Sequence, residues 1–353
     1  MKPTVLFGIL NWGLGHATRT IPLINAFIEN DFEVIIASDG DALLFLKEEF
    51  PELGFFNLPG YNVKYPYKSI FFNILKYLPN ILYAIIRENK EVKKISKIVG
   101  PSLIISDNRY GFKSKNIKSI IITHQINLQL VNKILSKAGS ALNRKLISSF
   151  DELWIPDLKN NLLAGELSKV PFGIKHQYLG PLSRFKFFDS DKKYEIAVVL
   201  SGPEPQRSIL EEIILEQFAK VKMKSIIILG KINEKKEWYL NDNVKIKNYA
   251  LSYELNEILN QSELIISRSG YSTIMDLAVL QKKAVLIPTP GQSEQEYLAT
   301  FFKNKNIFYS VQQDNFDLGI AIKKSKLYYG LKVEPGLFYK IIGEINMEFI
   351  DRQ

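Results

Sequence analysis

The stretch Ile265–Phe302, IISRSGYSTIMDLAVLQKKAVLIPTPGQSEQEYLATFF, carries the clearest structural pattern in the chain. An apolar run ends in a Ser/Gly turn and is followed by a helical pattern. A second apolar run then ends in a Pro/Gly turn and a polar cluster. This order of strand, helix and strand is typical of parallel strands covered by helices.

The same alternation extends to both sides of this stretch. The first half contains the runs TVLFGIL (4–10), EVIIAS (33–38), SLIISD (102–107), SIIITH (119–124) and ELWIP (152–156). After a Pro-, Ser- and charge-rich stretch the second half adds EIAVVLSG (195–202), SIIILG (225–230), NVKIKNY (243–249), ELIISRSG (263–270) and KAVLIPTPG (283–291). Two such series predict two doubly wound α/β domains with a cleft between the carboxyl ends of their strands. We place them at 1–180 and 194–334, joined by a linker at 181–193, with 335–353 as a helix that crosses back to the first domain.

Composition excludes several classes of protein. Of the 353 residues, 46% are hydrophobic and 24% charged, as in ordinary folded α/β proteins. The chain has no cysteine, which excludes disulfides, thiolate metal sites and a cysteine nucleophile. The most apolar segment has only ten uncharged residues in a row, 77–86, far fewer than the ~20 that a spanning helix needs. We expect no signal peptide and a cytoplasmic location.

The net charge of +9 is concentrated in the first half. Between residues 60 and 147 there are 16 Lys and Arg against three acids, Glu88, Glu91 and Asp107. Such a region could attract phosphorylated substrates, anionic lipid or nucleic acid, or could be a solvated lysine-rich surface. No nucleic-acid-binding motif accompanies it, so nucleic acid is not an expected partner.

The loop NWGLGHATR (11–19) follows the first predicted strand. Gly13 and Gly15 match a dinucleotide fingerprint, but Thr18 stands where the third glycine belongs, which argues against an NAD site. Backbone N–H groups at such a helix start bind anions. His16 could accept a proton from a hydroxyl nucleophile, with Asp107 orienting its ring. A histidine that merely caps the helix is the open alternative.

The quoted stretch offers a second anion-binding turn. Ser269 and Gly270 precede a helix, and Asp276, six residues after Gly270, could accept hydrogen bonds from the diol of a ribose. The following cluster holds amides and carboxylates suited to sugar hydroxyls: Gln292, Glu294, Gln295 and Glu296. Taken singly, each feature could equally be a capped helix or a solvated loop.

On these residues, the chain resembles the inverting UDP-sugar transferases of the GT-B fold, in particular the lipid II-forming GlcNAc transferase family and relatives that open with GLGHATR. The resemblance implies a GT-B architecture of two Rossmann-like domains. It also implies transfer of a hexose or N-acetylhexosamine from a UDP-sugar to a hydroxyl acceptor, with inversion at the anomeric carbon.

The resemblance also implies roles for individual residues. It makes His16 the base, assisted by Asp107, and places the acceptor on the first domain near Gly13, Gly15, His124 and Asn127, the last two in THQINLQLVNK. The implied donor-binding residues are Ser201, Gly202, Arg207, Arg268, Ser269, Gly270, Ser272, Thr273, Asp276, Ser293, Glu294, Gln295 and Glu296.

Two departures from the family pattern stand out. LSGPEPQR (200–207) replaces a Gly-Gly-Ser-type phosphate loop, and its prolines remove amide donors, so we expect Arg207 to supply positive charge to the pyrophosphate. Glu296 stands where the lipid II enzyme has a second glutamine, so the identity of the sugar stays open.

The expected partners are a nucleotide-sugar donor and a hydroxyl acceptor. No metal or other cofactor is expected, because no DxD-like motif sits near the segments expected to line the cleft, and helix ends can take the electrostatic role of a metal. The amphipathic segment Tyr67–Arg87 could rest on the inner face of an anionic membrane beside a lipid-linked acceptor, or its apolar side could be core. A UDP-sugar 2-epimerase and a nucleotide-sugar-binding protein without catalysis are the competing interpretations.

Overall fold

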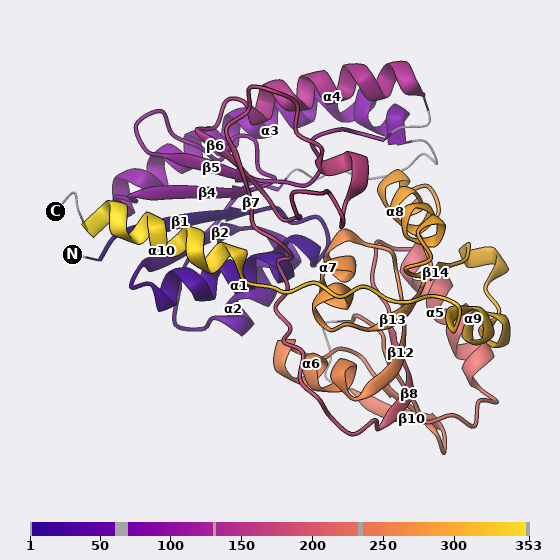
Figure 1. Ribbon diagram of the computed structural model, residues 1–353. Coiled ribbons are helices and arrows are strands. Elements are labelled where there is room, and N and C mark those ends of the chain that lie inside the picture. The colour runs from indigo at the N-terminus through magenta and orange to yellow at the C-terminus, as the bar shows by residue number, and fades with distance from the viewer. Residues whose placement is uncertain (1, 61–69, 130–131, 232–235, 351–353) are drawn as a thin grey trace. The chain divides into compact units, whose positions relative to one another are not determined.

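The computed structural model describes residues 2–60, 70–129, 132–231 and 236–350, with 70–82 and 348–350 as helix backbone only. The chain divides into two units, Met1–Leu182 with Pro335–Gln353, and Ser183–Glu334. Each unit contains one seven-stranded sheet flanked by helices (Figure 1). Two doubly wound α/β units are therefore present, as the alternating pattern predicts.

The sheet of unit 1 is parallel throughout and has the order β3-β2-β1-β4-β5-β6-β7. Its strands are β1 (Thr4–Ile9), β2 (Glu33–Ser38), β3 (Gly54–Asn57), β4 (Leu103–Asp107), β5 (Ser119–Ile122), β6 (Glu152–Ile155) and β7 (His176–Tyr178). The inner strands are buried along almost their whole length, which suits parallel strands covered on both faces.

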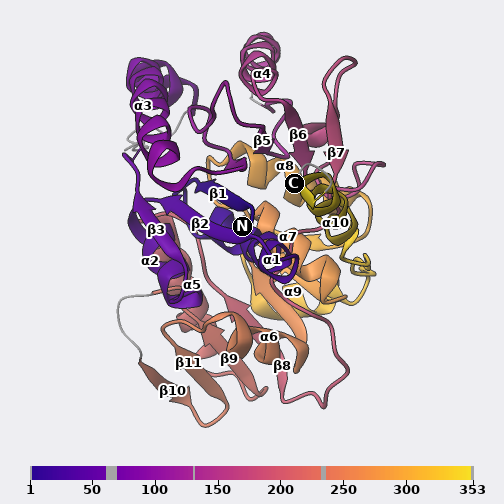
Figure 2. The same ribbon diagram turned by 90° about the vertical axis from the view of Figure 1, so that its left-hand side faces the viewer.

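Helices cover both faces of this sheet. They are α1 (Gly15–Glu29), α2 (Gly40–Glu49), α3 (Ile70–Val99), α4 (Lys133–Ile147), the short η1 (Gly165–Ser168) and α10 (Leu337–Ile350). Figures 1 and 2 show α3 and α4 over one face and α1, α2 and α10 over the other. The last helix packs against α1, so the C-terminal segment belongs to unit 1.

Unit 2 has the strand order β10-β11-β9-β8-β12-β13-β14. Its elements are β8 (Tyr194–Val199), α5 (Gln206–Phe218), β9 (Ser225–Ile228), β10 (Glu237–Asn241), β11 (Val244–Lys247), α6 (Ser252–Asn260), β12 (Ser262–Ser267), α7 (Tyr271–Val279), β13 (Lys283–Leu286), α8 (Ser293–Asn304), β14 (Tyr309–Ser310), η2 (Gln313–Asn315) and α9 (Leu318–Ser325). All pairs are parallel except β10 with β11, which form a hairpin at one edge of the sheet (Figure 2).

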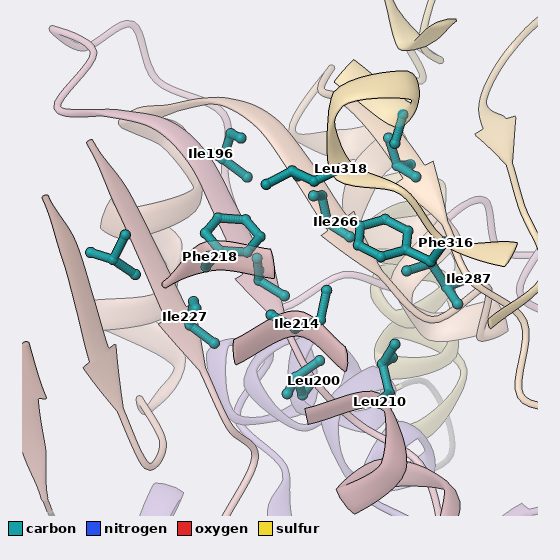
Figure 3. Packing of buried hydrophobic residues seen from close by; sticks show 14 of the residues in the cluster. Ile196, Leu200, Leu210, Ile214, Phe218, Ile227, Ile266, Ile287, Phe316 and Leu318 are labelled. Carbon is teal, nitrogen blue, oxygen red and sulfur yellow. The ribbon is translucent and has the colours of Figure 1, made fainter. Parts of the chain in front are cut away.

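The main core of unit 2 lies between its sheet and the helices α5 and α9 (Figure 3). Phe218 and Ile214 of α5 are fully buried against Ile227 of β9 and Ile266 of β12. Each Å² of apolar surface removed from water contributes about 25 cal/mol to stability, so this burial holds the strands against their helices. The polar loops at the strand ends are thereby held on a rigid base.

The strand order reverses at one point in each sheet. In unit 1 the reversal lies between β1 and β4, and in unit 2 between β8 and β12. Ligands of open α/β sheets bind beyond the carboxyl ends of the strands at such points. In unit 1 the two strands at this point, β1 and β4, are followed by the loops 10–14 and 108–110. In unit 2 the corresponding strands, β8 and β12, are followed by the loops 200–205 and 268–270.

None of the helices in the described part of the chain has the length and apolar character needed to cross a bilayer. The segment Tyr67–Arg87 lies partly outside the described residues, since 67–69 are not described and 70–82 are known as backbone only. Its described remainder belongs to α3, where Tyr83 and Ile86 are exposed.

Candidate active site

The β1–α1 loop lies at the switch point of unit 1. Gly13 has φ of +69°, a left-handed conformation that favours glycine. Gly15 is the first residue of α1, and the N-cap residue, Leu14, has no side chain that can cap the helix. The loop therefore has the features of a backbone turn that can receive an anionic or polar group.

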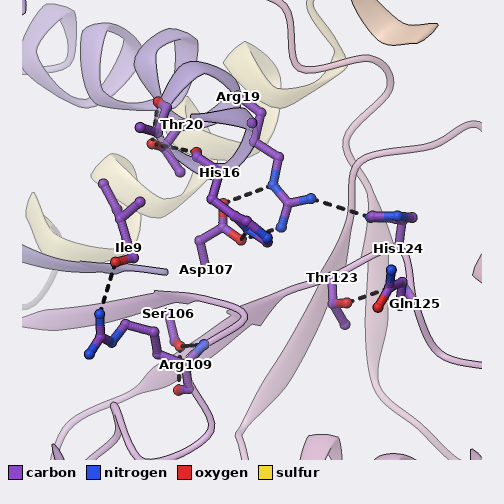
Figure 4. Close-up of polar contacts among 12 residues, drawn as sticks. Ile9, His16, Arg19, Thr20, Ser106, Asp107, Arg109, Thr123, His124 and Gln125 are labelled. Carbon is purple, nitrogen blue, oxygen red and sulfur yellow. Dashed lines mark hydrogen bonds and ion pairs between the residues drawn. The ribbon is translucent and has the colours of Figure 1, made fainter. Parts of the chain in front are cut away.

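His16 and Asp107 meet beside this loop, as the sequence predicts. Nδ1 of His16 lies 2.9 Å from Oδ1 of Asp107, the last residue of β4 (Figure 4). The Asp107 side chain is 0% exposed, whereas that of His16 is 14% exposed. With the proton on Nδ1, His16 donates to the carboxylate, and its Nε2 is left as a proton acceptor.

Arg19 completes this arrangement from the next turn of α1. Its Nε donates to Oδ2 of Asp107 at 2.8 Å, and its Nη2 donates to Oδ1, which makes a bidentate pair. Nη1 of Arg19 also lies 3.3 Å from Nδ1 of the buried His124. Both histidines and Asp107 thus surround one guanidinium (Figure 4).

The charges of this network favour a neutral His16. Burial lowers the pKa of His16, and the positive charge of Arg19 lowers it further, while Asp107 opposes both effects. Burial by itself would raise the pKa of Asp107, but Arg19 and His16 outweigh it and hold the pKa at about 2. At neutral pH the site therefore combines an ionised Asp107 with an uncharged imidazole, the state that a general base requires.

The predicted acceptor-side residues separate in the structure. His124 joins the Arg19 network, whereas Asn127 holds the chain around η1. Its Nδ2 donates to the carbonyl oxygens of Glu166 and Lys169, and its Oδ1 accepts from Arg144. Asn127 is thus engaged in a structural contact, and its role toward an acceptor stays a prediction.

A second buried arginine lies under the same loop. Arg109 is 0% exposed, and its guanidinium donates to the backbone oxygen of Ile9, to Asp39 and to Glu88. The other oxygen of Asp39 accepts from the side chain of Asn11, in the β1–α1 loop. Asp39, at the end of β2 where a dinucleotide site has its ribose acid, is therefore used to hold this loop.

In unit 2, the turn after β8 faces two polar atoms that lack partners. Gly202 has φ of +107°, and a Cβ there would lie 3.5 Å from Oγ1 of Thr289 and 3.9 Å from Nε of Arg268. Both atoms are buried, and neither has a hydrogen-bond partner among the described residues. Buried polar atoms of this kind call for a ligand, an ion or a water.

Arg268 is held rigidly in this position. Its Nη1 donates to the carbonyl oxygens of Ile287 and Pro288, and its Nη2 donates to Gln206 and Gln313, both at 2.6 Å. Burial lowers its pKa to about 10, so it remains a cation at neutral pH. The Nε–H of Arg268 and the hydroxyl of Thr289 together form a fixed donor pair beside Gly202.

The start of α7 supplies the predicted turn. Gly270 is its N-cap residue, without a side-chain cap in the described structure, and Ser272 and Thr273 lie in the first turn, partly buried. Ser269 is fully buried and donates to the backbone oxygen of Gln295 at 2.8 Å, which ties this turn to α8. Its hydroxyl is therefore a structural contact, and any ligand contact falls to the backbone.

Asp276 lies on the same helix and is partly buried. Its Oδ1 accepts a hydrogen bond of 2.6 Å from the hydroxyl of Ser183. Burial raises the pKa of Asp276 to about 7, even though Ser183 and the charge of Arg184 act in the opposite direction. The carboxylate is thus poised between its two protonation states at neutral pH.

The polar cluster at the start of α8 mostly stabilises its own loop. Oε1 of Gln295 accepts from the backbone N–H of Thr289, and Nε2 donates to Gln292 at 2.6 Å. Oε1 of Glu296 accepts from the N–H of Gly291. Ser293 and Glu294 lie in the first turn of α8, partly buried. Contacts of Gln295 and Glu296 with a donor sugar stay predictions, made beside these structural bonds.

Arg207 differs most from the expectation. It is buried at the start of α5, where its guanidinium pairs with Glu204 and Glu211 and also donates to the backbone oxygen of Leu229. Two carboxylates already neutralise its charge, so this placement does not support a role in binding pyrophosphate. Ser201 and Gly202, by contrast, are exposed on the neighbouring turn.

Residues 196–326 match the family model of the glycosyltransferase family 28 C-terminal domain. A UDP-N-acetylglucosamine--N-acetylmuramyl-(pentapeptide) pyrophosphoryl-undecaprenol N-acetylglucosamine transferase of Buchnera aphidicola subsp. Acyrthosiphon pisum (strain Tuc7) is 27% identical over 261 residues, 68% of each chain. Its namesake from Clostridium botulinum (strain Alaska E43 / Type E3) is 25% identical over 310 residues, 82% of this chain and 80% of that protein. The chain is a glycosyltransferase of the GT-B fold.

Solved glycosyltransferases share the fold along the whole chain. SnogD from Streptomyces nogalater superposes with a TM-score of 0.62 at 14% sequence identity, covering 100% of both chains. Acinetobacter baumannii MurG gives a TM-score of 0.57 at 10% identity, covering 99% of this chain and 100% of that one. At these identities the likeness establishes the architecture of the glycosyltransferase.

Sequence reasoning missed three polar residues of the two sites. Arg19 stands inside the quoted loop motif, and its spacing of three from His16 places both on one face of α1, which is a readable signal. Thr289 and Ser183 are single hydroxyl residues in irregular segments and carry no such pattern. Their positions emerge only when the glycosyltransferase is folded.

Proposed function

We propose that the glycosyltransferase transfers a sugar from a uridine diphosphate sugar to a hydroxyl of a lipid-linked acceptor, with inversion at the anomeric carbon. The names of the two relatives specify a UDP-N-acetylglucosamine donor and a pyrophosphoryl-undecaprenol acceptor. The family 28 match over residues 196–326 supports donor binding in unit 2. The sugar and the precise acceptor are left open.

The single observation that carries the proposal is the His16–Asp107 pair. A neutral imidazole, oriented through Nδ1 by a buried carboxylate and partly exposed at the surface, is the arrangement that deprotonates a hydroxyl nucleophile. The acceptor oxygen would give its proton to Nε2 of His16 as it attacks the anomeric carbon. The bond to the nucleoside diphosphate breaks in the same displacement.

The hydrogen-bond donor pair beside Gly202 supports a binding site for the diphosphate leaving group. The Nε–H of Arg268 and the hydroxyl of Thr289 are fixed, buried and without partners among the described residues. We propose that they and the start of α7 bind the diphosphate, which gains negative charge as the sugar departs. We place the ribose of the nucleotide at Asp276, through a hydrogen bond to its carboxylate.

A thermal-shift panel of UDP-, GDP- and dTDP-sugars tests the donor assignment. A ligand that binds only the folded state raises the melting temperature, so UDP-GlcNAc or another UDP-sugar should raise it with the logarithm of its concentration over Kd. The proposal predicts smaller shifts with GDP- and dTDP-sugars. If no nucleotide sugar shifts the transition, the donor site is misassigned.

Product analysis then tests the reaction itself. With a UDP-sugar and a polyprenyl-pyrophosphoryl acceptor, NMR of the product should show inverted anomeric configuration. Free sugar or a 2-epimer as the main product, formed without acceptor, would contradict the proposed transfer.

We also propose that the enzyme works in the cytoplasm at an anionic membrane surface. Helix α4 exposes Ile134 and Leu142 together with the lysines 133, 137 and 145. Apolar and basic side chains on one exposed helix favour contact with anionic headgroups. Sedimentation with phosphatidylglycerol vesicles, but not with phosphatidylcholine vesicles, is the expected result. Equal pelleting with both would contradict it.

A further inference from the structure

The hydroxyl of Ser183 is placed against the nucleotide-binding carboxylate proposed above. Ser183 is the first residue of unit 2, on the segment that enters it from unit 1, and lies 93 positions before Asp276. The hydrogen bond between Oγ of Ser183 and Oδ1 of Asp276 measures 2.6 Å, and the serine is 8% exposed. No sequence motif links these residues.

The direction of this hydrogen bond is fixed by a second one. Oγ of Ser183 accepts from the backbone N–H of Phe185 at 3.1 Å. Since an ionised carboxylate can only accept, and this N–H already occupies a lone pair of the serine oxygen, the hydroxyl proton is directed to Asp276. The serine thus donates to the carboxylate from a backbone-anchored position and occupies one of its two oxygens.

The charged surroundings of Asp276 are sparse. No other charged residue occurs in α7, and Arg184, next to Ser183, is the cation that acts on the carboxylate among the described residues. Arg184 itself donates to Ser252 of α6 and lies over the ring of Phe185 at 4.9 Å. The crossing segment 183–185 therefore supplies both the hydrogen bond and the charge that favour the ionised form.

We infer that Ser183 is a positioning residue for the nucleotide: it orients the Asp276 carboxylate and favours its ionised form, so that its second oxygen accepts a hydroxyl of the ribose. This inference rests on the proposed donor site. It assigns a binding role to the segment that joins the two units. Burial raises the pKa of Asp276, and the serine hydrogen bond opposes this shift because charge-assisted hydrogen bonds are about twice as strong as neutral ones.

Calorimetric titration with UDP, on the full chain, tests the inference. Ser183→Ala should weaken UDP binding at pH 7 roughly 5- to 10-fold, the effect of about one hydrogen bond. Ser183→Thr, which keeps the hydroxyl, should restore most of the affinity. Ser190→Ala is the matched control, since this serine lies on the same segment and its buried hydroxyl has no partner among the described residues.

The pH dependence separates positioning from a general loss of structure. Losing the serine donor raises the pKa of Asp276 further, so the Ser183→Ala protein should regain UDP affinity between pH 7 and 8.5, more steeply than the unchanged protein. Asp276→Asn removes the titrating carboxylate, so any pH dependence of UDP affinity that remains in this variant reports the ionisation of UDP itself. A uniform loss at every pH would overturn the inference.

The outcomes also separate this inference from the proposed function. If Asp276→Asn lowers UDP affinity but Ser183→Ala leaves it unchanged or raises it, the serine does not position the carboxylate and the inference fails alone. If UDP does not bind, or Asp276→Asn binds it normally, the donor site and the inference both fail.

Discussion

His16 and Asp107 share a hydrogen bond of 2.9 Å although 91 residues separate them in the chain. One follows β1 and the other ends β4, and these strands are neighbours in the sheet because its order reverses between them. Parallel strands end at the same edge, so residues that follow β1 and β4 are brought together there. The pair is thus a direct product of the topology.

Replacing His16 by alanine should remove the proposed base. We expect kcat to fall by roughly 10²- to 10⁴-fold, the usual contribution of general base catalysis, with UDP affinity unchanged within twofold. Steady-state kinetics and calorimetry measure the two effects. His176→Ala is the matched control, because this histidine is exposed and its ring contacts only Tyr178 and the Ile174 carbonyl among the described residues. Full turnover by His16→Ala would exclude it as the base.

The pH profile of kcat, measured at saturating UDP-sugar so that Asp276 does not contribute through donor binding, should reflect the lowered pKa of His16. The base acts when neutral, and burial with Arg19 holds its pKa below the ordinary 6.5. Activity should therefore be level around pH 7 to 8 and fall with a slope of one as the pH drops below this lowered pKa. If the profile shows a titration above pH 6.5 that the residual activity of His16→Ala lacks, the assignment of a lowered pKa to His16 as the base is wrong.

Asp107→Asn should reduce both activity and stability. It leaves the guanidinium of Arg19 buried without its carboxylate, and breaking a buried ion pair in this way costs about 3–5 kcal/mol. Urea unfolding measures the loss, with Asp151→Asn as an exposed control that should change stability far less. Since the pKa of Asp107 is depressed to about 2 in the folded state, the unchanged protein should lose this stabilisation as pH falls below 4, and Asp107→Asn should lack that component.

Thr289→Val should weaken nucleotide binding without destabilising the fold. Its buried hydroxyl has no partner among the described residues, so an apolar replacement of the same shape removes no internal hydrogen bond. UDP affinity should fall about fivefold, while the melting temperature of the free protein stays within a degree or two. Thr300→Val on α8 serves as the control, because the hydroxyl of Thr300 already donates to the backbone oxygen of Glu296. Unchanged affinity would remove Thr289 from the diphosphate site.

Chelation tests the expected metal independence. Because fixed donors from Arg268 and Thr289 face Gly202, we expect EDTA to leave transferase activity within twofold and added Mg²⁺ to restore nothing. An activity that EDTA abolishes and Mg²⁺ restores would show that a divalent ion carries the diphosphate charge instead.

The inner strands of both sheets could be predicted because they are continuous apolar runs. The edge strands β3, β7, β10 and β14 could not be predicted. The first three are short and partly exposed and have no regular apolar pattern, and β14 has only two residues. An edge strand is defined by the neighbour it pairs with, and the sequence does not display that neighbour.

The candidate site was predictable to the extent that its residues lie in contiguous motifs. His16, Gly270 and Asp276 stand in recognisable turns or helices. Arg207 was predicted to bind the pyrophosphate because the sequence shows a basic residue there. Its pairing with Glu204 and Glu211 depends on the rotamers of the folded helix, which the sequence does not show. Contacts made by single hydroxyl residues, such as Ser183 with Asp276, depend wholly on tertiary folding.

The chain leaves unit 1 after Leu182 and returns to it at Pro335, and a Cβ on Gly180 would lie 3.4 Å from Cδ1 of Leu337. The exit and the return are therefore adjacent, and unit 2 is an insertion that interrupts unit 1 at a single place. Its excision, with a few glycines bridging the gap, should yield a self-contained unit 1 whose binding to lipid vesicles can be examined in isolation.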